Sequence, residues 1–363
     1  MKLWNDQKDD LLAGRKPRPK DDRATVGEAV NAFLDAKDTA VKAGELTARS
    51  WRDYKRAAAG MIKEFGRNRP LADLRPQDFA ALKRKWAARY SLVTIGNAVQ
   101  KVRVVLKWAY ESGIIDTPIR TGPDFKRPSK KARRRAKQAA GPNMLSAEEV
   151  RAMIDNASSD AMRAMLLLGI NCGLGNTDLA TLPLRAVDLR TGWHFHGRPK
   201  TGTERRCPLW PETITALKVA IASRPKPKNP ADEGLVFLTK YGRPFIRQPE
   251  HGEGTSAAWI DGVAQETKKI LKKIGVKRAK VGFYTLRRTF QTVADESCDL
   301  AAVRLIMGHA DSDDDMTATY RQKIADSRLA NVAKCVHAWL FPPAKPADET
   351  RSIDPVSADE QKS

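Results

Sequence analysis

The C-terminal third of the chain carries an arginine, a histidine and a tyrosine in an order that suits attack on a phosphodiester: Arg287, His309 and Tyr320. An arginine holds a phosphate through two parallel, charge-assisted hydrogen bonds and keeps its charge. A histidine can donate to the same phosphate or move a proton near neutral pH. A tyrosine hydroxyl can act as a nucleophile and leave a covalent phosphotyrosine link. These three residue types predict chemistry on a nucleic-acid backbone.

The charge balance of the chain favours the same kind of partner. The sequence has 65 Lys and Arg against 43 Asp and Glu, a formal net charge of +22 and a pI near 9.9. Such an excess attracts a phosphate backbone and releases its counterions. Charge alone also fits a basic protein without a nucleic-acid partner, because charge indicates partners and not fold.

Other classes of function have weak support. No apolar run is long enough to span a membrane, and the first residues form no apolar signal region, which favours a cytoplasmic, nucleoid-associated protein of a bacterium or phage. His194 and His196 lack a third metal ligand at a suitable spacing, and no paired carboxylates predict two-metal chemistry. No Gly-rich phosphate loop predicts ATP use. We expect no metal and no cofactor, and four reduced cysteines at 172, 207, 298 and 335.

A basic run divides the chain. Residues 120–137 contain nine cations and one anion, and such a run cannot bury itself, so we expect a linker that is disordered or crosses a DNA backbone. The predicted organisation is a flexible N-terminus at 1–23, a helical DNA-binding domain at 24–119, a basic linker at 120–143, a second domain at 144–342 and a disordered tail at 343–363. The linker cations expected to contact DNA are Arg133, Arg134 and Arg135.

Helical periodicity dominates both predicted domains. Capping boxes at Thr25 and Ser146 predict helix starts, and Lys101, Arg103 and Lys107 interrupt the apolar positions of a helix at 97–110, where they would face DNA or water. Strand-like segments at 193–195 and 205–209 flank a turn that contains Lys200. The predicted fold class is mainly α with a small antiparallel sheet in the C-terminal domain.

Residues 24–341 resemble the tyrosine recombinases, the phage-integrase family. The resemblance rests on Tyr284-Thr285-Leu286-Arg287-Arg288, on Met307-Gly308-His309 and on Tyr320, which are similar to the family's His-x-x-Arg-His, Leu-Gly-His and nucleophilic Tyr. It implies a two-domain, C-shaped clamp on DNA in which Tyr320 forms a 3′-phosphotyrosine. Lys200 would protonate the leaving 5′ oxygen, while Arg287, His309 and Tyr284 would hold the phosphate. Further DNA contacts are expected at Arg205 and Arg288.

The sequence departs from the family pattern at its first arginine. Gly175 stands at that position, and Tyr284 replaces the usual histidine. A preorganised donor at a reacting phosphate is worth several kcal/mol, so a replacement is needed for full activity. Arg198, two residues before Lys200, is one hypothesis, and Asn176 at a helix start is a second. Asp178 matches the family's acidic position.

The resemblance also implies partners. The expected assembly is a homotetramer on a specific double-stranded DNA site, linked through an amphipathic helix at 328–340 that docks into a neighbouring subunit. Two alternatives stay open. One is a catalytically degenerate relative that binds DNA as a regulatory or assembly protein, and the other is a type IB topoisomerase that relaxes DNA without exchanging strands.

Overall fold

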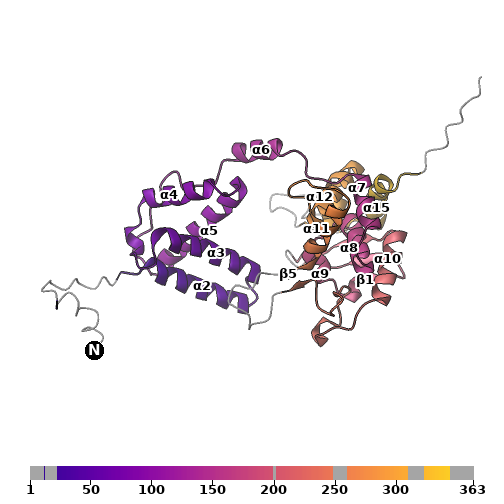
Figure 1. Ribbon diagram of the computed structural model, residues 1–363, viewed down its shortest axis with the longest axis horizontal. Coiled ribbons are helices and arrows are strands. Elements are labelled where there is room, and N and C mark those ends of the chain that lie inside the picture. Colours follow the sequence, from indigo (N-terminus) through magenta and orange to yellow (C-terminus); the bar gives the residue numbers. More distant parts are fainter. Residues whose placement is uncertain (1–11, 13–22, 199–201, 248–259, 310–322, 344–363) are drawn as a thin grey trace, which may run out of the picture. The chain divides into compact units, whose positions relative to one another are not determined.

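The computed structural model describes Leu12 and residues 23–198, 202–247, 260–309 and 323–343, and the chain divides into two units at 1–141 and 142–363. Figure 1 shows helices in both units and short strands only in the second. The predicted fold class, mainly α with small antiparallel sheets, is confirmed. Within the described residues, no helix combines the length and the apolarity that crossing a membrane requires.

The first unit is a helical bundle around one apolar core. Thr25 starts its first helix as predicted, because its hydroxyl accepts from the Glu28 backbone at 3.2 Å while the Glu28 carboxylate accepts from the Thr25 backbone at 2.9 Å. Phe33, Met61 and Phe79 are among the side chains buried in its centre. The elements are α2 (Val26–Lys42), α3 (Ala48–Phe65), η1 (Leu71–Asp73), α4 (Pro76–Ala87), α5 (Leu92–Glu111) and α6 (Lys130–Ala139).

The segment expected to be a disordered linker is structured. Phe125 is buried in the first unit's core, with its ring centroid 5.2 Å from that of Phe79. Ser129 then caps α6, accepting from the Ala132 backbone at 3.1 Å. No residue of α6 is fully buried, although the helix contacts α5, so the cap and local propensity contribute much of its stability. The expectation of disorder at 120–143 is therefore wrong for these residues.

The second unit is built on α8, which is buried along most of its length and packs against α10 and α12. Ser146 caps α7 through a complete capping box, as predicted. The helices are α7 (Ala147–Asp155), α8 (Asp160–Asn171), α9 (Asn176–Ala180), η2 (Leu184–Ala186), α10 (Pro211–Ala222), η3 (Pro230–Asp232), α11 (Gly262–Lys273), α12 (Phe283–Ala294), η4 (Asp295–Ser297), α13 (Leu300–Met307) and α15 (Asp326–Leu340).

Two small antiparallel sheets complete this unit. The first has the order β1-β2-β3, from β1 (Val187–Asp188), β2 (Trp193–Phe195) and β3 (Arg206–Pro208). His194 lies opposite Cys207 in the β2–β3 register, and both side chains are buried. The second sheet pairs β4 (Ile246–Arg247) with β5 (Ile260–Asp261).

The last described helix packs within its own unit. The buried face of α15 contains Leu329, Val332, Val336 and Leu340, and the Trp210 indole donates to the Ala333 carbonyl at 3.0 Å. An apolar face that is covered by its own chain is not available to a neighbour. The expectation that the helix at 328–340 docks into another subunit is therefore not supported by this structure. The N-terminal residues before Arg23, apart from Leu12, and the tail at 344–363 lie outside the described residues.

Candidate active site

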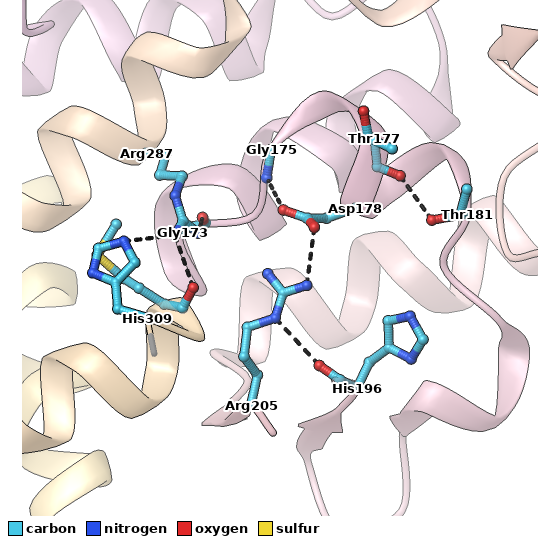
Figure 2. A network of polar contacts seen from close by, with 10 residues as sticks. Gly173, Gly175, Thr177, Asp178, Thr181, His196, Arg205, Arg287 and His309 are labelled. Carbon is cyan, nitrogen blue, oxygen red and sulfur yellow. Dashed lines mark hydrogen bonds and ion pairs between the residues drawn. The ribbon is translucent and has the colours of Figure 1, made fainter. Parts of the chain in front are cut away.

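Arg287 lies on the inner side of α12 and is among the largest buried side chains of the described residues. Its Nη1 donates to the Gly173 carbonyl at 2.6 Å (Figure 2). Its Nη2 donates to the Met307 carbonyl at 2.8 Å. Burial lowers the pKa of Arg287, and the positive charge of Arg198 lowers it further. Such a side chain still carries its charge at neutral pH. One guanidinium thus joins α12 to the segment after α8 and to the end of α13.

Gly173 is placed for this contact by its backbone. Its φ is +61°, and a β-carbon there would lie 2.9 Å from the Phe290 ring, so both conformation and space require glycine. The turn that follows α8 directs the Gly173 carbonyl at Arg287.

His309 is held by the end of α13. Gly308 adopts φ +60° and ψ +44°, its N–H donates to Leu305, and the His309 N–H donates to Arg304, which together form a Schellman motif. The His309 Nε2 lies 3.0 Å from Nη2 of Arg287. Because a guanidinium only donates, Nε2 accepts and the ring proton belongs on Nδ1. Burial lowers the pKa of His309, and the charges of Arg287 and Arg198 lower it further, which favours this neutral form.

Arg205 and Asp178 form a second buried pair beside the first arginine. Their Nη2 and Oδ1 are 3.0 Å apart, the Arg205 side chain is fully buried, and its Nε donates to the His196 carbonyl (Figure 2). Asp178 also accepts from the Gly175 N–H at 2.9 Å. Burial raises the pKa of Asp178, but the hydrogen bond and charge of Arg205 outweigh that effect and the net shift is downward. The expectation that Arg205 contacts DNA directly is not supported, because its side chain is buried in this pair.

Gly175 lies next to the exposed face of α12. A β-carbon at Gly175 would meet the Asp178 carboxylate at 3.3 Å and the ring of Tyr284 at 3.5 Å. Tyr284 is half exposed, and the guanidinium of Arg288 lies over its ring at 5.8 Å. The Gly175 position therefore contributes no side chain to the site, and the Tyr284 ring borders the space above it.

The hypothesised replacements for the first arginine differ in their surroundings. The amide of Asn176 donates to both carboxylate oxygens of Asp261, at 3.3 and 3.1 Å, so its donors are already used inside the unit. Arg198 follows the end of β2 rather than continuing the strand, and its N–H donates to Thr203 at 2.8 Å. Its β-carbon would lie 3.0 Å from one placed on Gly308. Of the two hypothesised donors, Arg198 is the one that lies beside His309.

Most of the other predicted site residues are exposed or form ion pairs, and two are not among the described residues. Lys200 and Tyr320 lie outside the described residues, as does the acidic run at 311–315. Lys101 pairs with Asp53 at 3.5 Å, and Lys107 pairs with Glu111 at 3.3 Å. The predicted cations that are exposed on their helices are Arg103, Lys107, Arg134, Arg135 and Arg288, while Arg133 is half-buried.

A cavity of about 640 Å³ adjoins this arrangement, bounded by the β2–β3 connection and α13, with His309, Arg205 and Arg304 in its wall. Cationic side chains around a cavity of this kind can hold an anion and stabilise charge that develops on it. Sequence reasoning missed Gly173, the Met307 carbonyl and the Arg205–Asp178 pair. Of these three features, only Gly173, a glycine that precedes a helix start, offered a signal in the sequence.

Comparison with known proteins agrees with this architecture. The phage integrase family matches residues 143–326, just over half of the chain, and the chain belongs to that family. Protein y4rF of Sinorhizobium fredii (strain NBRC 101917 / NGR234), described as an integrase or recombinase, is 34% identical over 173 residues, which cover 47% of this chain and 37% of that protein. A tyrosine recombinase XerC of Lactobacillus delbrueckii subsp. bulgaricus is 29% identical over 153 residues, which cover 41% and 46% of the two chains. The matched segment thus spans less than half the length of each relative.

Solved structures share the fold at low identity. A lambda integrase dimer bound to a COC′ core site superposes with a TM-score of 0.58 at 14% identity, covering 82% of this chain and 98% of that one. The Tn1549 transposon integrase in complex with a circular intermediate DNA gives 0.58 at 15% identity, covering 84% and 98%. At this level of identity the likeness establishes the fold alone.

Proposed function

We propose that the protein is a site-specific DNA recombinase that cleaves and rejoins strands through a phosphotyrosine intermediate. The observation that supports it best is the buried Arg287, whose guanidinium is fixed by two carbonyls and lies against His309. A charged group that is already fixed in position needs little rearrangement when charge develops on a bound phosphate. Membership of the phage integrase family supports the same class of reaction.

In the proposed reaction, the Tyr320 oxygen bonds to a DNA phosphorus while the phenol proton passes to water. The bond from phosphorus to the 5′ oxygen breaks, and Lys200 gives that oxygen a proton. Arg287, His309 and Tyr284 hold the phosphate. A 5′ hydroxyl from a second duplex then attacks the phosphotyrosine and releases Tyr320. Each step exchanges one phosphate ester for another, so the bond energy is retained and no oxidant or nucleotide is consumed.

The proposed partner is double-stranded DNA with a specific site. Structures of related fold include a lambda integrase tetramer bound to a Holliday junction, with a TM-score of 0.55. An assembly of the same order on DNA is part of the proposal, but we do not assign it to α15, whose apolar face is covered within its own unit.

A second candidate function is DNA binding without cleavage, in a degenerate relative. Gly175 favours it, because this position supplies no guanidinium. The two functions differ in one measurable product. Only an active recombinase leaves a covalent bond between its tyrosine and DNA.

The experiment uses a pool of random-sequence duplexes, each with a nick so that cleavage releases a short fragment and traps the intermediate. Adducts that survive denaturation are recovered and sequenced, which also gives the target site. The expected result is an adduct from the wild type and none from Tyr320→Phe, followed by joined duplexes when a second site is supplied. DNA binding without any adduct would support the degenerate relative, while relaxation of supercoiled DNA without joining would support a topoisomerase.

A further inference from the structure

Two further arginines, Arg198 and Arg205, and one carboxylate, Asp178, act electrostatically on Arg287. Burial lowers the pKa of Arg287, the charges of Arg198 and Arg205 lower it further, and the carboxylate of Asp178 acts in the opposite direction. Asp178 pairs with Arg205 at 3.0 Å, and Arg287 is satisfied by carbonyls and an imidazole, which carry no negative charge. Unbalanced charge in a partly buried site is costly until an anion arrives.

Arg198 is the member of this group with the most freedom to meet an anion. Its side chain is half-buried, and no carboxylate of the described residues forms an ion pair with it. Its backbone makes two hydrogen bonds, since its N–H donates to the Thr203 carbonyl at 2.8 Å and its carbonyl accepts from the Gly202 N–H at 2.9 Å. A hydrogen-bonded backbone with a guanidinium that no described carboxylate pairs suits a residue that binds an anionic ligand.

The β-carbon of Arg198 lies close to Gly308, the residue next to His309. Its β-carbon lies 3.0 Å from where a β-carbon on Gly308 would be, and Gly308 immediately precedes His309. Its charge contributes, after burial, to the lowered pKa of Arg287, and it contributes likewise to that of His309. Arg198 thus approaches the site from the β2–β3 turn, whereas Gly175 borders Tyr284 and Asp178.

We propose that Arg198 is a catalytic phosphate ligand whose guanidinium binds a non-bridging oxygen of the DNA phosphate held by Arg287, supplying the donor that Gly175 cannot. This inference rests on the proposed strand-cleavage function and adds one residue to it. Arg205 is not the proposed ligand, because its side chain is fully buried and its Nη2 pairs with Asp178.

The test compares Arg198→Ala and Arg198→Lys with wild type in single-turnover adduct formation on the recovered site. Arg190→Ala is the matched control, because Arg190 is an exposed arginine near the opposite end of β2. Two substrates are used, one with an ordinary scissile phosphate and one with a methylphosphonate there. The methyl group removes the negative charge of the phosphate, and with it the need for a neutralising cation.

We expect Arg198→Ala to slow adduct formation about 10²–10³-fold on the ordinary phosphate, in the range found for loss of one preorganised donor. Its deficit relative to wild type should shrink at least about tenfold on the methylphosphonate, Arg198→Lys should lie between, and Arg190→Ala should match wild type. Thermal unfolding of all variants should coincide with wild type.

Three outcomes would overturn the inference. Adduct formation by Arg198→Ala within about threefold of wild type would remove Arg198 from the reaction. An equal deficit on both substrates would assign it a structural role, because a misfolded site gains nothing from a neutral phosphate. Absence of any Tyr320-dependent adduct from the wild type would defeat the proposed function itself, and this result is distinguishable from the other two.

Discussion

Arg287 and His309 are joined by one hydrogen bond, with Nη2 and Nε2 3.0 Å apart, although they come from different helices. The same guanidinium also joins the Gly173 and Met307 carbonyls. Arg287, which is proposed to hold substrate, thus connects three segments of the second unit. Its chemical and its structural contributions are separable only by paired measurements.

Arg287→Lys should lose stability as well as activity. A lysine ammonium is a compact donor and cannot span both carbonyls as the planar guanidinium does. Each buried carbonyl left without a partner costs about 1–3 kcal/mol, so the free energy of unfolding should fall by about 2–4 kcal/mol in denaturant titrations. Arg288→Lys, an exposed neighbour on α12, is the control and should change stability by less than about 0.5 kcal/mol. Equal stability of the two variants would mean that the ties to the carbonyls are unimportant.

Gly308→Ala should be more damaging than a left-handed backbone alone explains. The left-handed region costs a non-glycine residue about 1–2 kcal/mol, and a β-carbon on Gly308 would also lie 2.6 Å from the Arg205 side chain. Gly275 has φ +79° with nothing within 4 Å of an added β-carbon, so Gly275→Ala measures the backbone cost alone. We expect Gly308→Ala to exceed it by about 1–3 kcal/mol in chemical denaturation, because overpacking adds to strain. Matching losses would show that Arg205 moves aside freely.

Asp178 and Arg205 should be strongly coupled in a double-mutant cycle. Removing one partner of a buried ion pair leaves the other charge uncompensated and costs about 3–5 kcal/mol. Asp178→Asn and Arg205→Met should each show a loss of this size in the free energy of unfolding, and the double variant should lose at least about 2 kcal/mol less than their sum. Simple additivity would indicate that the pair is not formed in solution.

The buried His194 predicts how stability depends on pH. Burial lowers its pKa from 6.5 to about 3, the charges of Arg205 and His196 act in the same direction, and Asp178 opposes them. Between pH 6.5 and about pH 3, His194 binds a proton in the unfolded chain and does not bind it in the folded chain. The stability contributed by the neutral ring is therefore complete above pH 6.5 and is lost as pH falls toward 3, by about 1.4 kcal/mol per pH unit.

Between pH 6.5 and pH 5 this contribution amounts to about 2 kcal/mol. His194→Leu should lack this pH-dependent contribution, so its free energy of unfolding should fall less than that of wild type over the same interval. Neither ring nitrogen of His194 has a hydrogen-bond partner among the described residues, so leucine breaks no such bond there. Identical pH profiles for the two proteins would contradict a buried, neutral His194.

Local patterns predicted much of the fold. The capping boxes at Thr25 and Ser146 are both present, because they depend on residues three apart in the sequence. Helical periodicity likewise located the helices of both units. Disorder, one of the two forms left open for the basic linker, does not describe α6, because charge composition says little about a helix that a serine cap can start.

The candidate site was only partly predictable, for a different reason. Arg287 and His309 were identified from their motifs, and the structure brings them together. Arg205 was expected on the surface, because nothing local to it indicates that Asp178, far away in the sequence, would draw it into the interior. Pairings across long sequence separations depend on tertiary structure, and a residue's own neighbours do not encode them.

The arrangement on α12 has a consequence for any genetic screen of this protein. The helix directs Arg287 inward and Tyr284 outward, only one turn apart. A cell that carries a change at Arg287 would have less of the protein, since a weakened fold is cleared by proteases, and it would look inactive for that reason alone. A change at Tyr284 leaves the interior intact, so a defect seen there reports on what the protein does to its substrate.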